Sequence, residues 1–420
     1  MNKTLVLSIS FFLIGFNSFA QWDLLTSGTS QSLNSVYFTN STIGYAVGAS
    51  GTIMKTTDGG AIWNSQVSGT TQIFNSVYFI NSTTGYAVGA SGTIMKTTDG
   101  GITWTNVYLG GGSSQYYSLF FTDINTGYVV GSIDWGNQGI ILKTTDGGTT
   151  WNVSVTGIPL YSVYFVGSNI GYAVGWVFDL NNFNDIYKTT DGGVNWTSQG
   201  QGAGYRLMSI FFIDANMGYA VGGNIINNID YGDVILKTIN GGVNWIILSS
   251  GTTTSLSSVY FTDADTGYAV GRNGNIRKTN DGGTTWLSQP SGTTNNLNSV
   301  FFTDPNTGFL VGDHGTILQT TNGGGPTVGI IEPPMQTNTS QNNLKIYPNP
   351  ATEKITIEQS ESGSKMAGTV FIYGVAGQEL IKQQALGLKE ELNVGSLPAG
   401  IYFISLVNNE KNEFGKFIKE

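Results

Sequence analysis

Short stretches in which hydrophobic and polar residues alternate recur along most of the chain. They are rich in Val, Ile, Tyr, Phe and Thr, and they are bounded by Gly, Asn or Asp. Such residues and such alternation favour β-strands, whose successive side chains point to opposite faces. No stretch shows a competing helical periodicity. The pattern therefore predicts an all-β protein.

The strand pattern is organised in repeats. The first unit contains Ser35-Val36-Tyr37-Phe38, then Gly44-Tyr45-Ala46-Val47-Gly48, and then a segment from Thr52 to Trp63. The glycine that opens the second of these runs recurs, in steps of 41 to 49 residues, at Gly44, Gly85, Gly127, Gly171, Gly218, Gly267 and Gly308. Seven units of four predicted strands are typical of a seven-bladed β-propeller, with an open β-solenoid as the alternative.

The tryptophans distinguish the two architectures. Six units end in a tryptophan, the first at Trp63, whereas the seventh ends at Gly325 without one. Trp22 lies 11 residues before Leu33, as Trp63 lies 11 residues before Phe74. We therefore expect the N-terminal segment to supply the outer strand that the last blade lacks. A ring uses such a strand because closure removes free sheet edges, whereas a solenoid does not.

Charge and composition divide the chain into parts. Residues 21–325 contain 17 Asp and no Glu, whereas residues 326–420 contain ten Glu and no Asp. We expect a propeller over residues 21–325, a linker rich in Pro, Thr, Asn and Gln over residues 326–342, and a small C-terminal β-sandwich over residues 343–420. Lys3, the apolar run from Leu5 to Phe16, and Ser18-Phe19-Ala20 predict a secretory signal peptide over residues 1–20.

Each propeller unit contains a turn of the form Thr-Thr-Asp-Gly-Gly before its tryptophan. The aspartate position is occupied by Asp58, Asp99, Asp146, Asp191, Asn240, Asp281 and Asn322. A short side-chain oxygen there can accept hydrogen bonds from turn N–H groups, and glycine tolerates positive φ. Because Asn replaces Asp twice, we interpret the position as structural rather than as a calcium ring or a catalytic set.

These turns resemble the Asp-box, or bacterial neuraminidase repeat. Together with Gly-Tyr-Ala-Val-Gly, they make residues 21–325 similar to the photosystem II assembly and stability factor family of propellers. The resemblance implies a non-enzymatic assembly factor that binds membrane-protein intermediates through an arginine-rich patch. This propeller has only Arg206, Arg272 and Arg277, so we carry over the fold and the binding character only.

The tail closely resembles a type A C-terminal sorting domain of the type IX secretion system of Bacteroidetes. Tyr347-Pro348-Asn349-Pro350 at its start and Lys416-Phe417-Ile418-Lys419 at its end are the specific motifs. The resemblance implies that residues 343–420 engage the type IX machinery. The protein would then be secreted or held at the outer cell surface, by way of the periplasm. An ordinary accessory sandwich is the alternative.

The units differ mainly in the loop between their second and third strands, which is longer in blades 3, 4 and 5. Because strands alternate in direction, this loop lies on the face opposite the Asp-box turns, and variation on one face of a repeat array often marks a binding surface. The longer loops contain Asp134, Trp135, Trp176, Phe178, Asp179, Phe183, Asp185, Asp230, Tyr231 and Asp233. Aromatic rings beside carboxylates suit a glycan or a protein ligand, although these loops can also simply pack on one another.

Two other features have plainer interpretations. The six propeller lysines, with Gln319 in the seventh blade, occupy one repeated strand position: Lys55, Lys96, Lys143, Lys188, Lys237 and Lys278. We expect solvated or Asp-paired side chains there rather than a cationic ring around an anion. His314, the single histidine, is expected to be an exposed loop residue rather than a catalytic one.

Composition excludes several kinds of site and argues against one class of partner. The chain has no Cys, so disulfides, thiol nucleophiles and thiolate metal sites are excluded, and no metal or cofactor is predicted. A net charge of −9 argues against nucleic acid as a partner. The sequence predicts a non-enzymatic binding or scaffold propeller, monomeric, with a glycan or protein ligand. A glycoside hydrolase, for instance using Asp179 with Asp233, and photosystem II assembly remain as alternatives.

Overall fold

The structure of the chain is a computed structural model that describes residues 22–176, 186–199, 205–226, 229–325, 345–358, 368–373, 379–385, 389–407 and 412–420. The predicted signal peptide (residues 1–20) and linker (residues 326–342) lie outside these residues, so the domain bounds stay predictions. Within the described residues, no helix is long and apolar enough to cross a membrane.

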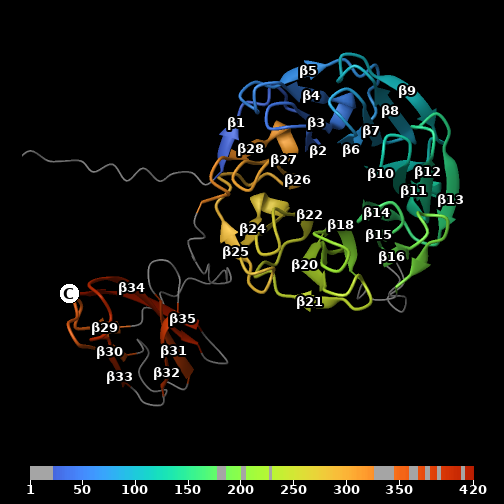
Figure 1. Cartoon of the computed structure of the whole chain (residues 1–420). Helices are drawn as coiled ribbons and strands as arrows, with labels where there is room; N and C mark the ends of the chain where they lie inside the picture. The colour runs from blue at the N-terminus through green and yellow to red at the C-terminus, as the bar shows by residue number, and fades with distance from the viewer. Residues whose placement is uncertain are drawn as a thin grey trace, which may run out of the picture.

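Seven four-stranded antiparallel sheets form a ring, as Figure 1 shows, and the predicted seven-bladed propeller is confirmed. Blade 1 contains β2 (Leu33–Phe38), β3 (Gly44–Gly48), β4 (Ile53–Thr56) and β5 (Asn64–Gln66). Blade 2 contains β6 (Phe74–Phe79), β7 (Gly85–Gly89), β8 (Thr93–Thr97) and β9 (Thr105–Leu109). Blade 3 contains β10 (Gln115–Phe121), β11 (Gly127–Ile133), β12 (Gln138–Thr144) and β13 (Asn152–Thr156).

The remaining blades follow the same order from the innermost strand outward. Blade 4 contains β14 (Leu160–Phe165), β15 (Gly171–Gly175), β16 (Ile186–Thr189) and β17 (Thr197–Ser198). Blade 5 contains β18 (Arg206–Phe212), β19 (Gly218–Ile226), β20 (Ile229–Thr238) and β21 (Ile246–Leu248). Blade 6 contains β22 (Leu256–Phe261), β23 (Gly267–Gly271), β24 (Ile276–Thr279) and β25 (Leu287–Gln289). Blade 7 contains β26 (Leu297–Phe302), β27 (Gly308–Gly312), β28 (Ile317–Thr320) and β1 (Asp23–Leu25).

The ring closes as the tryptophan pattern predicted. Strand β1 pairs antiparallel with β28, with Leu24 opposite Leu318, so the N-terminal segment is the outer strand of blade 7. Trp22 is buried, its indole N–H donates to Gln289 Oε1 at 3.0 Å, and its ring meets Tyr268 and Phe302 edge-on. The first and last parts of the propeller are therefore joined within one sheet.

The first five residues of the second strand are buried in every blade, because a neighbouring blade packs on either side of them. Its two glycines are required by close approach. A Cβ on Gly44 would lie 2.5 Å from the Phe38 ring, and one on Gly48 would lie 1.9 Å from the Ser32 carbonyl oxygen. The repeated Gly-Tyr-Ala-Val-Gly run therefore reflects packing between strands.

Neighbouring blades are joined at a repeated seam. In blades 1 to 6, the tyrosine of the second strand and the lysine of the third strand donate to one glycine carbonyl in the next blade's Asp-box turn, each at 2.6 to 2.8 Å. At the first seam, Tyr45 Oη and Lys55 Nζ both donate to the Gly100 oxygen. The expectation of solvated or Asp-paired lysines was therefore wrong, because ring packing brings a backbone acceptor to each ammonium group.

The seam between blades 7 and 1 is an exception. Phe309 replaces the tyrosine, and Gln319 replaces the lysine. The Gln319 side-chain amide still donates to the equivalent carbonyl, that of Gly59, but at 3.2 Å. At this glycine carbonyl the seam therefore has one long side-chain hydrogen bond, where each of the other six seams has two short ones.

The tail forms a sandwich of two sheets that share one core, as predicted. One sheet has the order β29 (Lys345–Tyr347), β30 (Lys354–Glu358) and β33 (Lys389–Asn393). The other has the order β32 (Glu379–Ala385), β31 (Gly368–Tyr373), β34 (Gly400–Val407) and β35 (Asn412–Lys419). Buried Ile355 and Leu392 of the first sheet belong to the same core as Val370 and Phe417 of the second.

The two motifs of the tail meet in space. The Asn349 side chain accepts from the Ile418 N–H at 2.8 Å and donates to the Lys416 carbonyl at 3.3 Å. The Ala351 N–H donates to the Ile418 carbonyl, and the Glu420 N–H donates back to the Ala351 carbonyl. The start of the domain is thus held against its last strand.

Candidate functional site

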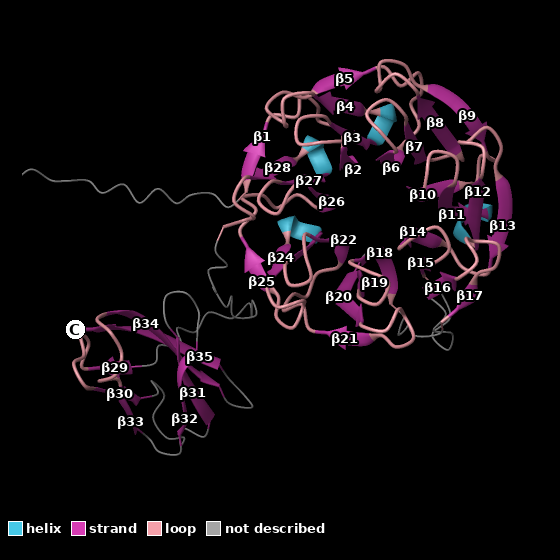
Figure 2. Ribbon diagram, viewed as in Figure 1, coloured by secondary structure: helices cyan, strands magenta, loops and turns pink. Residues whose placement is uncertain are grey.

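The turns between the second and third strands lie on one face of the ring, hereafter the upper face. Four short 3-10 helices mark these turns in blades 1, 3, 6 and 7, and they are cyan in Figure 2: η1 (Ala49–Gly51), η2 (Asp134–Gly136), η3 (Arg272–Gly274) and η4 (Asp313–Gly315). In blade 3 the flanking strands β11 and β12 have seven residues each, and in blade 5 β19 and β20 have nine and ten. The corresponding strands of blade 1 have five and four. The longer loops of blades 3 and 5 are therefore built as extended hairpins.

Trp135 lies at the tip of the blade 3 hairpin and is 83% exposed. Its φ is +58°, in the left-handed region, and the neighbouring Asp134 has φ +52°. The other 3-10 turns place Ser50, Asn273 and His314 at the position of Trp135, with the same backbone. A tryptophan in that conformation gains no burial in return, so it contributes little to the stability of the fold.

Trp176 is part of a cluster at the start of the inner strands of blades 3, 4 and 5. The guanidinium carbon of Arg206 lies 4.5 Å from the centre of the Tyr161 ring and 5.5 Å from that of Trp176. Tyr161 in turn contacts Tyr117 of blade 3, with ring centres 4.9 Å apart. Burial raises the pKa of Tyr161, and the nearby Arg206 charge opposes that rise. A half-buried cation is thus held between two aromatic faces on the upper side of the ring.

The inner-strand position that Tyr117 and Tyr161 occupy has a different role in blades 1, 2 and 7. Asn34, Asn75 and Asn298 occupy it in blades 1, 2 and 7, and each donates a side-chain hydrogen bond of 2.8 to 2.9 Å to the main chain of the next blade. Blades 3 and 4 have Tyr117 and Tyr161 instead. Tyr117, Tyr161 and Arg206 are not among the site residues predicted from the sequence. Aligning the repeats at this inner-strand position would have revealed the two tyrosines.

The other predicted site residues are less fully described. Asp233 lies in β20 opposite Gly223 and is half-buried. Asp230 is paired within the same hairpin, opposite Ile225, and Tyr231 follows it in β20. Phe178, Asp179, Phe183 and Asp185 lie outside the described residues. Of the predicted site residues, Trp176 contacts Arg206, which in turn contacts Tyr161.

Seven aromatic rings line the innermost strands in a closed circle. Each contacts the next, with ring centres 5.0 to 5.6 Å apart: Tyr37, Tyr78, Phe120, Tyr164, Phe211, Tyr260 and Phe301. Burial raises the pKa of Tyr164 to about 12, with smaller contributions from Tyr260 and Tyr78. The circle packs the inner strands of neighbouring blades against one another.

The Asp-box side chains are hydrogen-bonded within their own turns. The Asp58 Oδ1 atom accepts from the Thr56 hydroxyl at 2.8 Å and from the Ile62 N–H at 3.0 Å. Asn240 accepts the same two bonds in blade 5, from Thr238 and from the Asn244 N–H. Hydrogen bonds from the residue four positions later lower the pKa to about 2 at Asp99, Asp146 and Asp191. These bonds support a structural role for the box.

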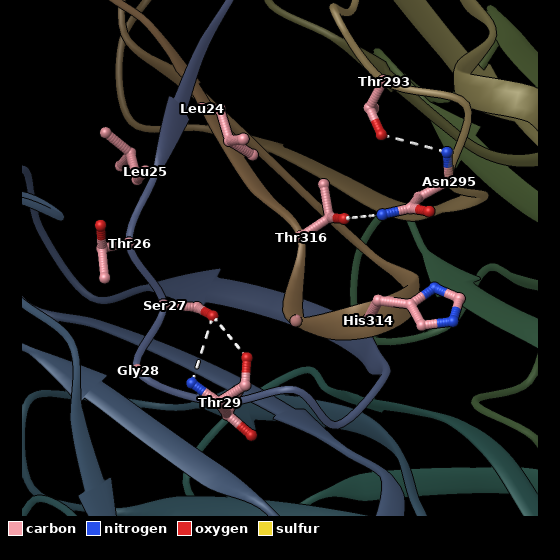
Figure 3. Close-up of a pocket in the computed structure, with 11 residues that line it drawn as sticks. Leu24, Leu25, Thr26, Ser27, Gly28, Thr29, Thr293, Asn295, His314 and Thr316 are labelled. Carbon is pink, nitrogen blue, oxygen red and sulfur yellow. Dashed lines mark hydrogen bonds between the residues drawn. The ribbon is translucent and has the colours of Figure 1, made fainter.

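A separate hollow of about 420 Å³ lies beside the closing strand. Figure 3 shows Leu24 and Thr29 of the N-terminal segment, Asn295, and His314 of the η4 turn around it. Its polar groups are largely bonded to one another, since Asn295 Nδ2 donates to the Thr316 hydroxyl at 2.9 Å. His314 is exposed, as expected, and the Asp313 carboxylate beside it accepts from Asn296 and Asn298.

Among the described residues, no group of three or more His, Cys, Asp or Glu is placed to hold a metal ion.

Comparisons with known proteins agree with both resemblances. A family model described as photosynthesis system II assembly factor YCF48 matches residues 15–111, 63–230 and 237–324. The chain belongs to this family. A second model, the secretion system C-terminal sorting domain, matches residues 345–420. The sorting domain shows that the protein is exported by way of the periplasm to the cell surface or beyond it. No curated protein matches the sequence.

Solved structures show the same fold. YCF48 bound to D1 peptide is 21% identical, covers 73% of this chain and 98% of its own, and has a TM-score of 0.58. PorZ of Porphyromonas gingivalis, described as a surface component of the type IX secretion system, is 11% identical, covers 90% and 58%, and has a TM-score of 0.52. A GH74 enzyme of Niastella koreensis is 13% identical, covers 94% and 74%, and has a TM-score of 0.56. At these identities the likeness is one of fold.

Proposed function

We propose that the exported propeller is a monomeric, non-enzymatic binding module whose ligand, a glycan or a protein, contacts the upper face over blades 3 to 5. The observation that supports this most is the cation–aromatic cluster in which Arg206 lies between Tyr161 and Trp176. Trp135 is exposed on the same face of the neighbouring blade 3. Aromatic faces beside a guanidinium group suit stacking with a sugar ring or a side chain, together with directed hydrogen bonds.

The relatives are consistent with either ligand class. One family member is a YCF48 bound to a D1 peptide, which supports a peptide ligand for a propeller of this kind. The GH74 propellers are enzymes, which supports a glycan ligand and keeps a glycoside hydrolase as the second candidate. A photosystem II assembly role receives less support, because this propeller has three arginines and Arg206 is already stacked between aromatic rings.

The described turn aspartates suit a structural role rather than hydrolysis. Most glycosidases need two carboxyl groups across the scissile bond, and the general acid among them has a raised pKa. In the propeller, hydrogen bonds lower the pKa of the turn aspartates, among them Asp123, Asp214 and Asp304. A lowered pKa suits a hydrogen-bond acceptor in a turn. Asp233, one member of the hydrolase pair proposed from the sequence, lies on the upper face in β20.

The test combines a glycan array, a peptide array and a hydrolase screen on the mature chain. For any ligand found, we expect Trp135→Ala and Trp176→Ala to weaken binding by about tenfold or more each. Matched controls are His314→Ala, at the same turn position in blade 7, and Arg272→Gln in blade 6, which should leave affinity unchanged. Turnover of any glycan would overturn the non-enzymatic assignment. Unchanged affinity in a folded Trp135→Ala/Trp176→Ala double variant would exclude this face as the binding surface.

A further inference from the structure

The sorting domain has two outer faces of different character. The four-stranded sheet β32-β31-β34-β35, labelled in Figure 1, covers the core with one face and exposes aromatic and aliphatic side chains on the other. Phe403 and Ile418 are both 47% exposed, and Leu380 is 39% exposed. Native surfaces seldom gather large apolar side chains on one sheet face unless that face is covered in use.

These side chains are neighbours by strand register. Tyr373 pairs with Phe403, and Phe403 pairs with Lys416, so the three form one row across β31, β34 and β35. Phe371, two residues from Tyr373, stacks near it with ring centres 6.1 Å apart. Because residues opposite one another in an antiparallel sheet share a face, these rings make a continuous aromatic row on the outer side.

Lysines accompany this row. Lys382 lies over the Phe371 ring, with its Nζ 5.4 Å from the ring centre, and both Lys382 and Lys416 are exposed. Glu379 of β32 lies opposite Tyr373 in the strand register. The ion pairs of the tail that the structure describes, Lys354–Glu391 at 2.7 Å and Lys389–Glu358 at 3.2 Å, lie instead on the three-stranded sheet. The aromatic face thus presents two exposed lysines, and the described ion pairs of the tail include neither of them.

We propose that this face, defined by Phe371, Tyr373, Phe403, Ile418, Lys382 and Lys416, docks onto a protein of the type IX secretion apparatus that presents an apolar surface edged by carboxylates. The sorting role of the domain supplies the class of partner, and the two exposed lysines favour carboxylates on that partner. Buried aromatic anchors would provide most of the affinity. The two lysines would orient the domain and favour an acidic partner over a neutral one.

The test follows export of the full-length chain in a bacterium that has the type IX system. Wild type, Phe403→Thr/Ile418→Thr and Lys382→Glu/Lys416→Glu are compared by the ratio of surface-plus-medium protein to periplasmic protein. We expect both double variants to lower this ratio about tenfold or more, since loss of two anchor residues weakens docking at least that much. Lys382→Arg/Lys416→Arg should export normally, because charge is retained. The matched control is Lys354→Gln/Glu391→Gln, which removes an exposed ion pair on the other sheet.

Folding is checked on each purified full-length variant by thermal unfolding and protease resistance. If the Phe403/Ile418 variant does not fold, the lysine reversal decides, since both lysines are exposed. Normal export of the folded reversal variant would overturn the proposal. Equal loss of export in the Lys354/Glu391 control would also overturn it. If the folded reversal variant exports normally but no longer binds anionic lipid vesicles, the face is assigned to membranes and the proposal is likewise overturned. Deleting residues 345–420 tests the sorting role itself: retention of export there would refute that role and not merely the face.

Discussion

The seam between blades 7 and 1 provides a test of what holds the ring together. At the other six seams a tyrosine hydroxyl and a lysine ammonium share one carbonyl acceptor, at 2.6 to 2.8 Å. Phe309 is placed like those tyrosines, since it stacks on Phe38 with ring centres 4.1 Å apart and Tyr45 stacks on Phe79 at 3.9 Å. The perturbation is Phe309→Tyr, which would direct a new hydroxyl at the Gly59 carbonyl.

The magnitude follows from the acceptor that is already present. A buried hydrogen bond between neutral groups stabilises a protein by about 0.5–1.5 kcal/mol net. For a domain of this size, about 1 kcal/mol corresponds to roughly 2 °C in the midpoint of thermal unfolding. We therefore expect Phe309→Tyr to raise Tm by about 1–3 °C. Adding Gln319→Lys would increase it further through a charge-assisted bond.

The assay is calorimetric unfolding of the mature chain, with hydrogen exchange at β1 and β28 as a local measure of ring opening. The reverse change at a regular seam, Tyr45→Phe, is the matched control and should lower Tm by a similar amount. If Phe309→Tyr destabilises the protein as much as Tyr45→Phe does, the seam hydrogen bonds do not determine closure, and the reasoning fails.

Three further predictions concern stability. The pKa of Asp99, Asp146 and Asp191 is lowered to about 2 from an unfolded value near 4. The stability that these carboxylates contribute is therefore present above pH 4 and is lost as pH falls from about 4 to 2. Asp99→Asn should flatten the dependence of Tm on pH in that window. Burial raises the pKa of Tyr45, Tyr86, Tyr128 and Tyr172 to about 12. The stability that these tyrosines contribute is therefore present below about pH 10 and is lost as pH rises from 10 to 12. Thermal unfolding at alkaline pH should show a steep fall in Tm in that window, and Tyr45→Phe/Tyr86→Phe should reduce the fall. Trp22→Ala should cost about 3–5 kcal/mol in denaturant unfolding, because a buried closing side chain is removed, whereas Trp135→Ala, at an exposed position, should change stability by less than about 0.5 kcal/mol.

The repeat made most of the fold predictable. Strand number, blade number and the donated N-terminal strand all follow from recurring residues, and the position of Trp22 together with the missing tryptophan of the seventh unit predicted closure. The lysine position was misjudged for a physical reason. Lys55 bonds to a carbonyl 45 residues away, and that contact exists only once two blades pack in a ring. A strand pattern specifies which face of a sheet a residue is on, but not which backbone atom of the next sheet faces it.

The candidate site was only partly predictable for a related reason. Trp135 and Trp176 were identified because they depart from the repeat in the longer loops. Arg206 begins an inner strand, at a position that varies among the units and is charged in blade 5 alone. Its significance depends on Tyr161 and Trp176 of blade 4 lying within 6 Å of its guanidinium group. Which side chains of different blades lie together depends on the closed ring, and the sequence of a single unit does not predict it.

Closure by the N-terminal strand has a consequence for the order of folding. Leu24 and its partner Leu318 are separated by 294 residues, whereas each hairpin within a blade spans only a few. The entropy of bringing such distant segments together costs about 5 kcal/mol, against roughly 1.4 kcal/mol for a five-residue turn, on the usual logarithmic dependence on loop length. The blades can therefore form one after another as the chain emerges. The ring itself stays open until residue 320 is available, so β1 is the first strand made and the last to be paired.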